Sequence, residues 1–275
     1  MVVLVTGASG QLGQALQSIG PEYKDITFYF ASSREADITD ISGLETIFSR
    51  IAPDYCINAA AYTAVDKAES DSENAYKVNV EGAANIAKVC NKYNTVLIHV
   101  STDFVFEGNK TTPYTEEDET NPQGVYGRTK REGEIEIKKN LREHYIVRTS
   151  WLYSQYGNNF MKTMLRLAAE RESLGVVNDQ TGTPTHAVDL ARAIMTIITS
   201  RIKQYGVYHY SNEGETTWYG FADKIFEVNA IDIDLKPIPT EAYPTPAKRP
   251  AYSVLDKSKI KKVFGIEISN WEDRV

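Results

Sequence analysis

The first 150 residues alternate short apolar runs with longer amphipathic stretches. Each run is apolar at successive positions, which is typical of strands in a parallel sheet that is covered by helices on both faces. We therefore predict an α/β fold with a doubly wound parallel sheet. The predicted strands are Val2–Thr6, Ile26–Phe30, Tyr55–Asn58, Val96–Val100 and Tyr145–Arg148.

Helical spacing appears between these runs and again in the second half of the chain. From Ser72 to Lys92, small and apolar residues repeat at helical spacing, which predicts a helix packed close to the sheet. Helices are also predicted over 159–170 and 187–199, whereas four prolines make 238–250 largely non-helical. The expected organisation is a sheet domain of residues 1–150, to which 176–210 return, and a smaller mixed α/β part formed by 151–175 and 211–275.

Composition narrows the class of protein. The chain has 275 residues, 42% hydrophobic and 24% charged, which suits a globular protein with a sizeable core. A net charge of −7 argues against a nucleic-acid partner. No apolar run reaches the roughly 20 residues that span a bilayer, so no membrane partner is expected. The opening segment lacks the pattern of a signal peptide, and Cys56 and Cys90 lack a metal or redox motif, so we expect a cytoplasmic protein. The histidines show no ligand spacing, and no metal site is expected.

A glycine-rich loop follows the first predicted strand. Gly7, Gly10 and Gly13 have the spacing G-x-x-G-x-x-G, and the helix they open begins at about Gln11 and Leu12. Without side chains the loop can approach a pyrophosphate, while the free N–H groups of the helix point at the anion. This context predicts a Rossmann-like dinucleotide-binding domain over residues 1–150.

The end of the second predicted strand bears on cofactor choice. An acidic residue that binds the ribose 2′-hydroxyl of NAD is expected there, but Ser32, Ser33 and Arg34 follow the strand instead. Two hydroxyls and a guanidinium suit a 2′-phosphate, so NADPH is the preferred cofactor, with NADH possible. The alternative is an ordinary polar loop. Asp37 and Ile38 stand at a spacing at which a carboxylate can meet the adenine amino group.

A tyrosine and a lysine stand four residues apart in VYGRTKREGE, 125–134. On a helix Tyr126 and Lys130 share a face, and Thr102 follows the fourth predicted strand at the edge where such folds bind ligands. A free tyrosine has a pKa near 10, and a neighbouring ammonium favours the phenolate and lowers that value. These residues therefore predict proton transfer beside a nicotinamide.

Several motifs resemble those of known enzymes. The resemblance to the extended short-chain dehydrogenase/reductases lies in TGASGQLG (6–13), NAAA (58–61), STDFVF (101–106) and YGRTK (126–130). Within that family the chain is similar to the dTDP-4-dehydrorhamnose reductases. The segments that carry this similarity are AAYTAVDKAES (60–70), RTSWLY (148–153), GNNFMKTMLRLA (157–168), VVNDQTGTPT (176–185) and AYPTPAKRP (242–250).

The resemblance implies hydride transfer to C4 of a 4-keto-6-deoxy sugar, the step from dTDP-4-dehydro-β-L-rhamnose to dTDP-L-rhamnose. It implies that Tyr126 donates a proton, that Thr102 holds the carbonyl oxygen, and that Lys130 tunes Tyr126 and binds the nicotinamide ribose. The glycine loop and the strand end discussed above already predict cofactor-binding residues, and the resemblance adds Ala60, Ala61, Tyr62 and Asn79. Some family members have an acidic residue where Ser32 and Ser33 stand, so this chain departs from the family there. Besides Tyr126 and Lys130, the full predicted cofactor set is Gly7, Gly10, Gln11, Leu12, Gly13, Ser32, Ser33, Arg34, Asp37, Ile38, Ala60, Ala61, Tyr62 and Asn79. Implied substrate-binding residues are Thr63, Val65, Thr102, Asp103, Phe104, Tyr126, Trp151, Asn159, Thr185 and Arg249, the last as the cation for the diphosphate.

Some of these residues also have a purely structural interpretation. Asn79 equally suits support of the fold, Trp151 suits a core position, and Asp103 suits a solvated strand end. Asp66 is expected to cap the following helix rather than to touch a ligand.

Two rival functions stay open. One is another extended reductase acting on a nucleotide sugar, an epimerase or a dehydratase. The other is a regulatory subunit that binds NADP without catalysis. We expect a nucleotide-sugar substrate and a monomer or homodimer.

Overall fold

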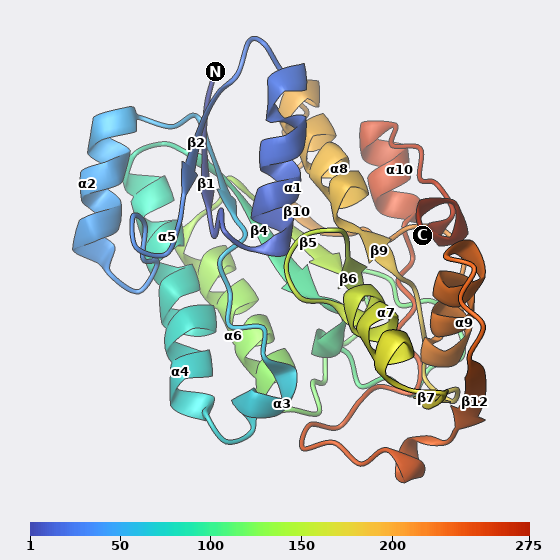
Figure 1. Ribbon diagram of the computed structural model, residues 1–275. Helices are drawn as coiled ribbons and strands as arrows, with labels where there is room; N and C mark the ends of the chain where they lie inside the picture. Colours follow the sequence, from blue (N-terminus) through green and yellow to red (C-terminus); the bar gives the residue numbers. More distant parts are fainter.

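A computed structural model describes residues 1–275, and a six-stranded parallel sheet runs through its centre (Figure 1). The strand order is β10-β5-β4-β3-β1-β2, and every pair in it is parallel. The predicted fold class is therefore confirmed, and β10 is a sixth strand beyond the five that were predicted. The bounds are β1 Val2–Thr6, β2 Thr27–Ala31, β3 Tyr55–Asn58, β4 Val96–Thr102, β5 His144–Thr149 and β10 Gly206–His209.

Helices cover both faces of this sheet because its strands bury side chains on both sides. Val3 and Val5 pack in a cluster with α1 and α8, whereas Leu4, which points to the other face, packs with α2, α5 and α6. The separation of the two helical layers is visible in Figure 1. Their bounds are α1 Gln11–Ile19, α8 Ala187–Ser200 and α10 Ser258–Phe264 on one face, and α2 Ile41–Ile51, α5 Gly82–Lys92 and α6 Val125–Asn140 on the other.

The strand order reverses between β1 and β3, and this reversal creates a crevice at the carboxyl ends of the strands. Gly7 follows β1 with a positive φ of 70°, and a side chain there would lie 2.6 Å from the backbone of Ala59, which follows β3. The two loops can approach this closely only because residue 7 is glycine.

The predicted helix from Ser72 to Lys92 is confirmed in extent but not in uniform winding. The chain forms α4 over Ser72–Tyr76, a π-helical turn η2 over Lys77–Glu81, and then α5. The wide turn carries the buried Asn79, whose amide donates to the Tyr62 carbonyl at 3.1 Å and to the Thr129 hydroxyl at 3.1 Å. A π turn at such a position is a common feature near functional sites.

The remaining elements form a smaller part beside the sheet, at the lower right of Figure 1. Its core contains Tyr153, Met164, Phe221 and Trp271. The division of the chain into domains stays a prediction; α8, β10 and α10 lie on the large sheet. No helix of the chain is both long and apolar enough to cross a membrane. The bounds here are β6 Leu152–Tyr153, α7 Phe160–Glu170, β7 Ser173–Val177, β8 Thr181–Gly182, β9 Thr185–His186, β11 Thr216–Thr217, α9 Trp218–Val228 and β12 Asp234–Ile238.

Short elements complete the structure. The proline-rich segment 238–250 has only one 3-10 turn, η4, as its composition predicts. The short helices are η1 Gly20–Glu22, α3 Val65–Ala68, η3 Asp103–Val105, η4 Thr240–Ala242 and η5 Trp271–Arg274.

Candidate active site

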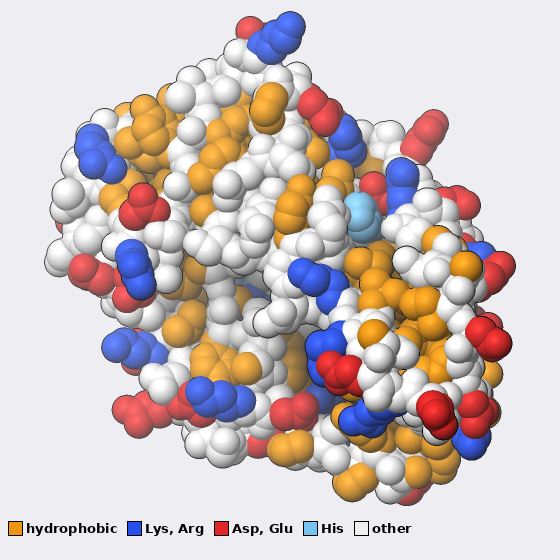
Figure 2. Space-filling view, in the orientation of Figure 1, with side chains coloured by type: hydrophobic (Ala, Val, Ile, Leu, Met, Phe, Trp, Pro, Cys, Tyr) orange, Lys and Arg blue, Asp and Glu red, His pale blue; other side chains and the backbone are white.

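A cavity of about 610 Å³ opens at the carboxyl edge of the large sheet, against the C-terminal part. Figure 2 shows a hollow between these two parts, with Lys and Arg side chains gathered at its edge. The cavity brings together more than half of the residues predicted for the site. They are Gly10, Gln11, Leu12, Ala61, Thr63, Val65, Thr102, Asp103, Phe104, Tyr126, Lys130, Trp151 and Arg249.

The glycine loop leaves the first turn of α1 open to this cavity. Gly10 is the N-cap of α1 and offers no side-chain cap, so the first N–H groups of the helix lack a side-chain partner. A side chain at residue 13 would lie 2.6 Å from the Cα of Ala8, so only glycine lets the loop fold this tightly. Uncapped amides beside a glycine loop fit the pyrophosphate of a dinucleotide. Gly7 and Gly13 shape the loop without lining the cavity.

The loop after β2 contains a carboxylate that the sequence prediction did not include. Glu35 accepts hydrogen bonds from the Ser32 backbone N–H at 2.8 Å and from its hydroxyl at 2.7 Å. The N–H bond is the main cause that lowers the pKa of Glu35, followed by the hydroxyl bond. Ser33 and Arg34 are exposed and stay available for a phosphate.

The two residues expected at the adenine lie just beyond this loop. Asp37 accepts from the N–H and hydroxyl of Thr39 at 2.9 and 2.8 Å, so one of its oxygens is already engaged. Ile38 is buried and lies against Gly82, where an added side chain would come within 2.7 Å of it. Neither residue lines the 610 Å³ cavity.

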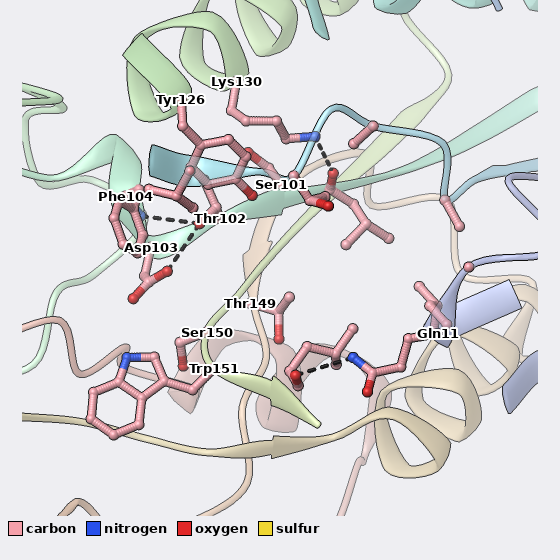
Figure 3. Close-up of a pocket in the computed structure, with 18 of the residues that line it drawn as sticks. Gln11, Ser101, Thr102, Asp103, Phe104, Tyr126, Lys130, Thr149, Ser150 and Trp151 are labelled. Carbon is pink, nitrogen blue, oxygen red and sulfur yellow. Dashed lines mark hydrogen bonds between the residues drawn. The ribbon is translucent and has the colours of Figure 1, made fainter. Parts of the chain in front are cut away.

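Strand β4 and helix α6 carry the predicted catalytic residues, and Figure 3 shows them gathered along the end of β4. The Thr102 hydroxyl donates to Asp103 Oδ1 at 3.0 Å and accepts from the Phe104 N–H at 3.2 Å. Lys130 Nζ donates to the Val100 carbonyl at 2.7 Å. Tyr126 stands on the same face of α6 as Lys130, so all three functional groups lie on one wall of the cavity.

Close packing sets the position of Tyr126. The next residue, Gly127, faces the Phe104 carbonyl oxygen, and a side chain there would fall on that oxygen. Helix α6 therefore rests directly on the η3 turn. The Phe104 ring meets the Tyr126 ring edge-on, with centroids 5.6 Å apart. Both contacts restrict the position of the phenol.

Burial, rather than a neighbouring charge, dominates the pKa values of these groups. It raises the pKa of Tyr126 to about 12, against a smaller lowering by the Thr102 hydroxyl. The expectation that an ammonium lowers this pKa is wrong for the structure, because burial sets the direction of the shift and the charge of Asp103 adds to it. Burial also lowers the pKa of Lys130 to about 8, opposed by the charge of Glu134. The Tyr126 phenol is therefore protonated at neutral pH and can donate its proton.

Two stacked tryptophans form the opposite wall. Trp151 has a positive φ of 44°, and its ring lies on that of Trp218 with centroids 3.5 Å apart. Both rings line the cavity. Trp151 is only partly buried, so it is a wall residue rather than a pure core residue.

The proline-rich loop brings Arg249 to the rim through an ion pair. Arg249 Nη2 lies 2.7 Å from Asp66 Oδ2, and Asp66 Oδ1 accepts from the Ala247 N–H at 3.2 Å. The prediction that Asp66 caps a helix is wrong, since it lies inside α3 and holds this loop. The Nη1 atom of Arg249 is buried without a partner. Arg249 also lines an adjoining cavity of about 610 Å³ together with Arg166 and Arg171.

Several predicted site residues lie behind the cavity wall. Asn159 caps α7 by accepting from the Lys162 N–H at 3.1 Å, and it donates to Gln11 Oε1 at 2.7 Å. Thr185 is fully buried and accepts from the Thr149 hydroxyl at 3.3 Å. A direct contact of these residues with a ligand stays a prediction. Ala60, Tyr62 and Asn79 likewise do not line the cavity.

Some cavity residues were not predicted from the sequence. Trp218 begins α9 and belongs to none of the motifs quoted above, whereas Gln180 lies between β7 and β8 within the segment VVNDQTGTPT but was not singled out as a site residue. Ser101 and Ser150 also line the cavity, and Ser101 Oγ is buried without a partner. Their position at the ends of β4 and β5 is a signal that could have identified them, because strand ends form this edge.

Comparison with known proteins places this geometry among sugar-nucleotide enzymes. The profile of the RmlD substrate binding domain matches residues 1–275. A dTDP-4-dehydrorhamnose reductase of Aggregatibacter actinomycetemcomitans is 42% identical, and the match covers 98% of this chain and 95% of that protein.

Solved structures agree with this similarity. The crystal structure of a dTDP-4-dehydrorhamnose reductase from Clostridium acetobutylicum superposes with a TM-score of 0.95 at 41% identity, covering 99% of this chain and 96% of that one. The reductase of Bacillus anthracis, solved in complex with NADP, gives a TM-score of 0.94 at 40% identity, covering 99% and 96%.

Proposed function

This chain belongs to the RmlD substrate binding domain family, and we propose that it reduces the C4 ketone of dTDP-4-dehydro-β-L-rhamnose to dTDP-L-rhamnose. The observation that carries the proposal is the shared wall of Thr102, Tyr126 and Lys130 beside the uncapped start of α1. Relatives and solved structures at about 40% identity, named as dTDP-4-dehydrorhamnose reductases, support this reaction.

NADPH is the proposed cofactor, with NADH as a weaker substitute. It supplies the hydride that reduces the ketone carbon. The open amides of α1 would hold its pyrophosphate, and the exposed Ser33 and Arg34 would bind the 2′-phosphate. The NADP complex of the Bacillus anthracis reductase supports this choice.

Side chains of the protein bind the carbonyl oxygen and supply the proton that it takes up. As negative charge develops on the carbonyl oxygen, the Thr102 hydroxyl would turn its one proton from Asp103 Oδ1 to that oxygen, and Tyr126 would donate its proton to it. Lys130 binds the nicotinamide ribose. Because burial raises the pKa of Tyr126 to about 12, the phenol is protonated at neutral pH before the reaction begins.

The second cavity suits the nucleotide half of the substrate. It adjoins the first through Gln180, Trp218 and Arg249, and it adds the cations Arg166 and Arg171. In an acidic protein such a local group of guanidinium ions favours a diphosphate. Arg249 Nη1, buried and unpartnered, is the proposed contact.

The test is Tyr126→Phe, with the exposed Tyr76→Phe as matched control. We expect Tyr126→Phe to lower kcat by about 10² to 10⁴-fold while the Kd for NADPH stays unchanged. The control should turn over like the wild type. Undiminished turnover in Tyr126→Phe would contradict the proton-donor role. A wild-type protein that binds NADPH tightly but reduces no nucleotide sugar would favour a regulatory subunit.

A further inference from the structure

A row of buried polar groups leads from behind the cavity wall to Lys130, and its other members, Thr6, Asn58 and His99, take no part in the chemistry proposed above. The Thr6 hydroxyl donates to Asn58 Oδ1 at 2.7 Å, and Asn58 Nδ2 lies 3.0 Å from His99 Nδ1. His99 Nε2 then lies 3.3 Å from Lys130 Nζ. All four side chains are at most 2% exposed, so water does not supply alternative partners.

The backbone N–H of Ala60 determines which atoms donate and which accept in the hydrogen bonds of Asn58 and His99. The Ala60 N–H donates to Asn58 Oδ1 at 3.2 Å, and a backbone N–H can only donate. The atom it meets is therefore the amide oxygen, and the amide nitrogen of Asn58 points at His99. Because that nitrogen is also only a donor, His99 Nδ1 accepts. A neutral His99 then carries its proton on Nε2, which faces Lys130.

A proton on Nε2 has a consequence for the lysine. An ammonium group has donors only, so an N–H of a charged Lys130 would face the Nε2–H of His99, and neither could accept. A neutral amine instead offers a lone pair that accepts the Nε2–H hydrogen bond. We propose that His99 is a positioning residue that keeps Lys130 as a neutral amine in the cofactor-free protein. Lys130 would then take up one proton from solvent, amine to ammonium, when anionic ligands enter the cavity.

The alternative arrangement costs a hydrogen bond. For a charged Lys130 to donate to His99, the imidazole proton would move to Nδ1 and the Asn58 amide would turn over. The Ala60 N–H would then face an NH₂ group and lose its acceptor, which is unfavourable for a buried donor. Protonation of Lys130 is thus opposed through His99, Asn58 and Ala60 together.

The other charged groups near His99 and Lys130 do not reverse the preference of Lys130 for the neutral amine. Glu134 on α6 favours the ammonium, but Arg148 on β5 already binds it through two hydrogen bonds of 2.9 and 2.7 Å. Burial is the main cause that lowers the pKa of His99, so His99 is neutral; a charge on Lys130, or on His144 at the start of β5, would lower that pKa further. Tyr126 and Asp103 share the cavity wall with Lys130. Burial, opposed by the charge of Glu134, already lowers the pKa of Lys130 to about 8.

The tautomer of His99 can be measured directly in the wild-type protein. ¹⁵N NMR of histidine-labelled, cofactor-free protein should show the Nε2–H form for His99, with its signal assigned by its loss in His99→Gln. The Nδ1–H form or an imidazolium at neutral pH would overturn the proposal. This experiment needs no turnover, so its result is independent of whether the sugar reaction is correct.

A second measurement follows the Lys130 Nζ signal with pH in wild type and in His99→Gln. The glutamine can turn its oxygen to Lys130, so the ionisation of Lys130 should move to higher pH by at least one unit, a tenfold change. His144→Gln, a buried histidine without contact to Lys130, is the control and should leave the titration unchanged. An equal titration in wild type and His99→Gln would reduce His99 to a packing residue and overturn the proposal.

Discussion

Asp103 gives the most quantitative prediction, because it is a carboxylate buried without full compensation. It is 2% exposed, its Oδ1 accepts one hydrogen bond from Thr102, and its Oδ2 has no partner. Burial raises its pKa from 3.8 to about 6. The folded protein therefore holds this proton more tightly than the unfolded chain does. Stability falls as the pH rises through this window, and the whole cost is present above pH 6.

The size of the effect follows from the shift. A difference of about 2 pH units corresponds to about 3 kcal/mol at roughly 1.4 kcal/mol per unit. Asp103→Asn keeps an oxygen for the Thr102 hydroxyl and carries no charge at any pH. We expect it to raise the free energy of unfolding by up to about 3 kcal/mol at pH 8, and by much less near pH 4.

Urea unfolding of both proteins across this pH range measures the difference. Asp118→Asn is the control of opposite sign, because Lys110 and Thr115 hold the pKa of Asp118 at about 2, and its loss should destabilise the protein at pH 8. A change in stability for Asp103→Asn that is independent of pH would refute the reasoning. We further expect turnover to fall in Asp103→Asn, since a carboxylate kept at this cost points to a role in the reaction.

Three further substitutions test the positioning of the site. Gly127→Ala should push α6 away from the Phe104 carbonyl, costing about 1–3 kcal/mol in urea unfolding and lowering kcat; full activity would contradict that contact. Arg148→Met leaves Glu134 charged and buried, so a loss of about 3–5 kcal/mol is expected, and a loss below about 1 kcal/mol would contradict the buried pair. Gln11→Leu removes the links from α1 to the start of α7, and should raise KM for the sugar about tenfold; an unchanged KM would show that these links do not order the pocket.

Local patterns predicted most of the fold. The strands β1 and β3 begin and end at the predicted residues, and α1 begins at Gln11, because glycine spacing and apolar runs are local signals. The π-helical turn η2 within the predicted helix was not foreseeable. It depends on Asn79 reaching Tyr62 and Thr129, which are distant in sequence.

The candidate site likewise contains residues that local motifs reveal and residues that only tertiary packing brings to it. Thr102, Tyr126 and Lys130 belong to motifs that are visible in the sequence, and the fold brings all three to one cavity. Trp218 reaches the wall only through tertiary packing on Trp151, and no local pattern marks it.

Long-range contacts and burial account for the remaining differences. The pairing of Asp66 with Arg249 joins residues far apart in the chain, so capping was the only role that local sequence suggested for Asp66. The raised pKa of Tyr126 likewise follows from burial, which spacing along a helix does not reveal.

The most direct test of the central claim is the oxidation of NADPH by the purified protein in the presence of dTDP-4-dehydro-β-L-rhamnose, repeated with NADH. We predict steady oxidation that requires the sugar and is faster with NADPH. Tight binding of NADPH without oxidation of either cofactor would contradict the assignment of this chain as a reductase.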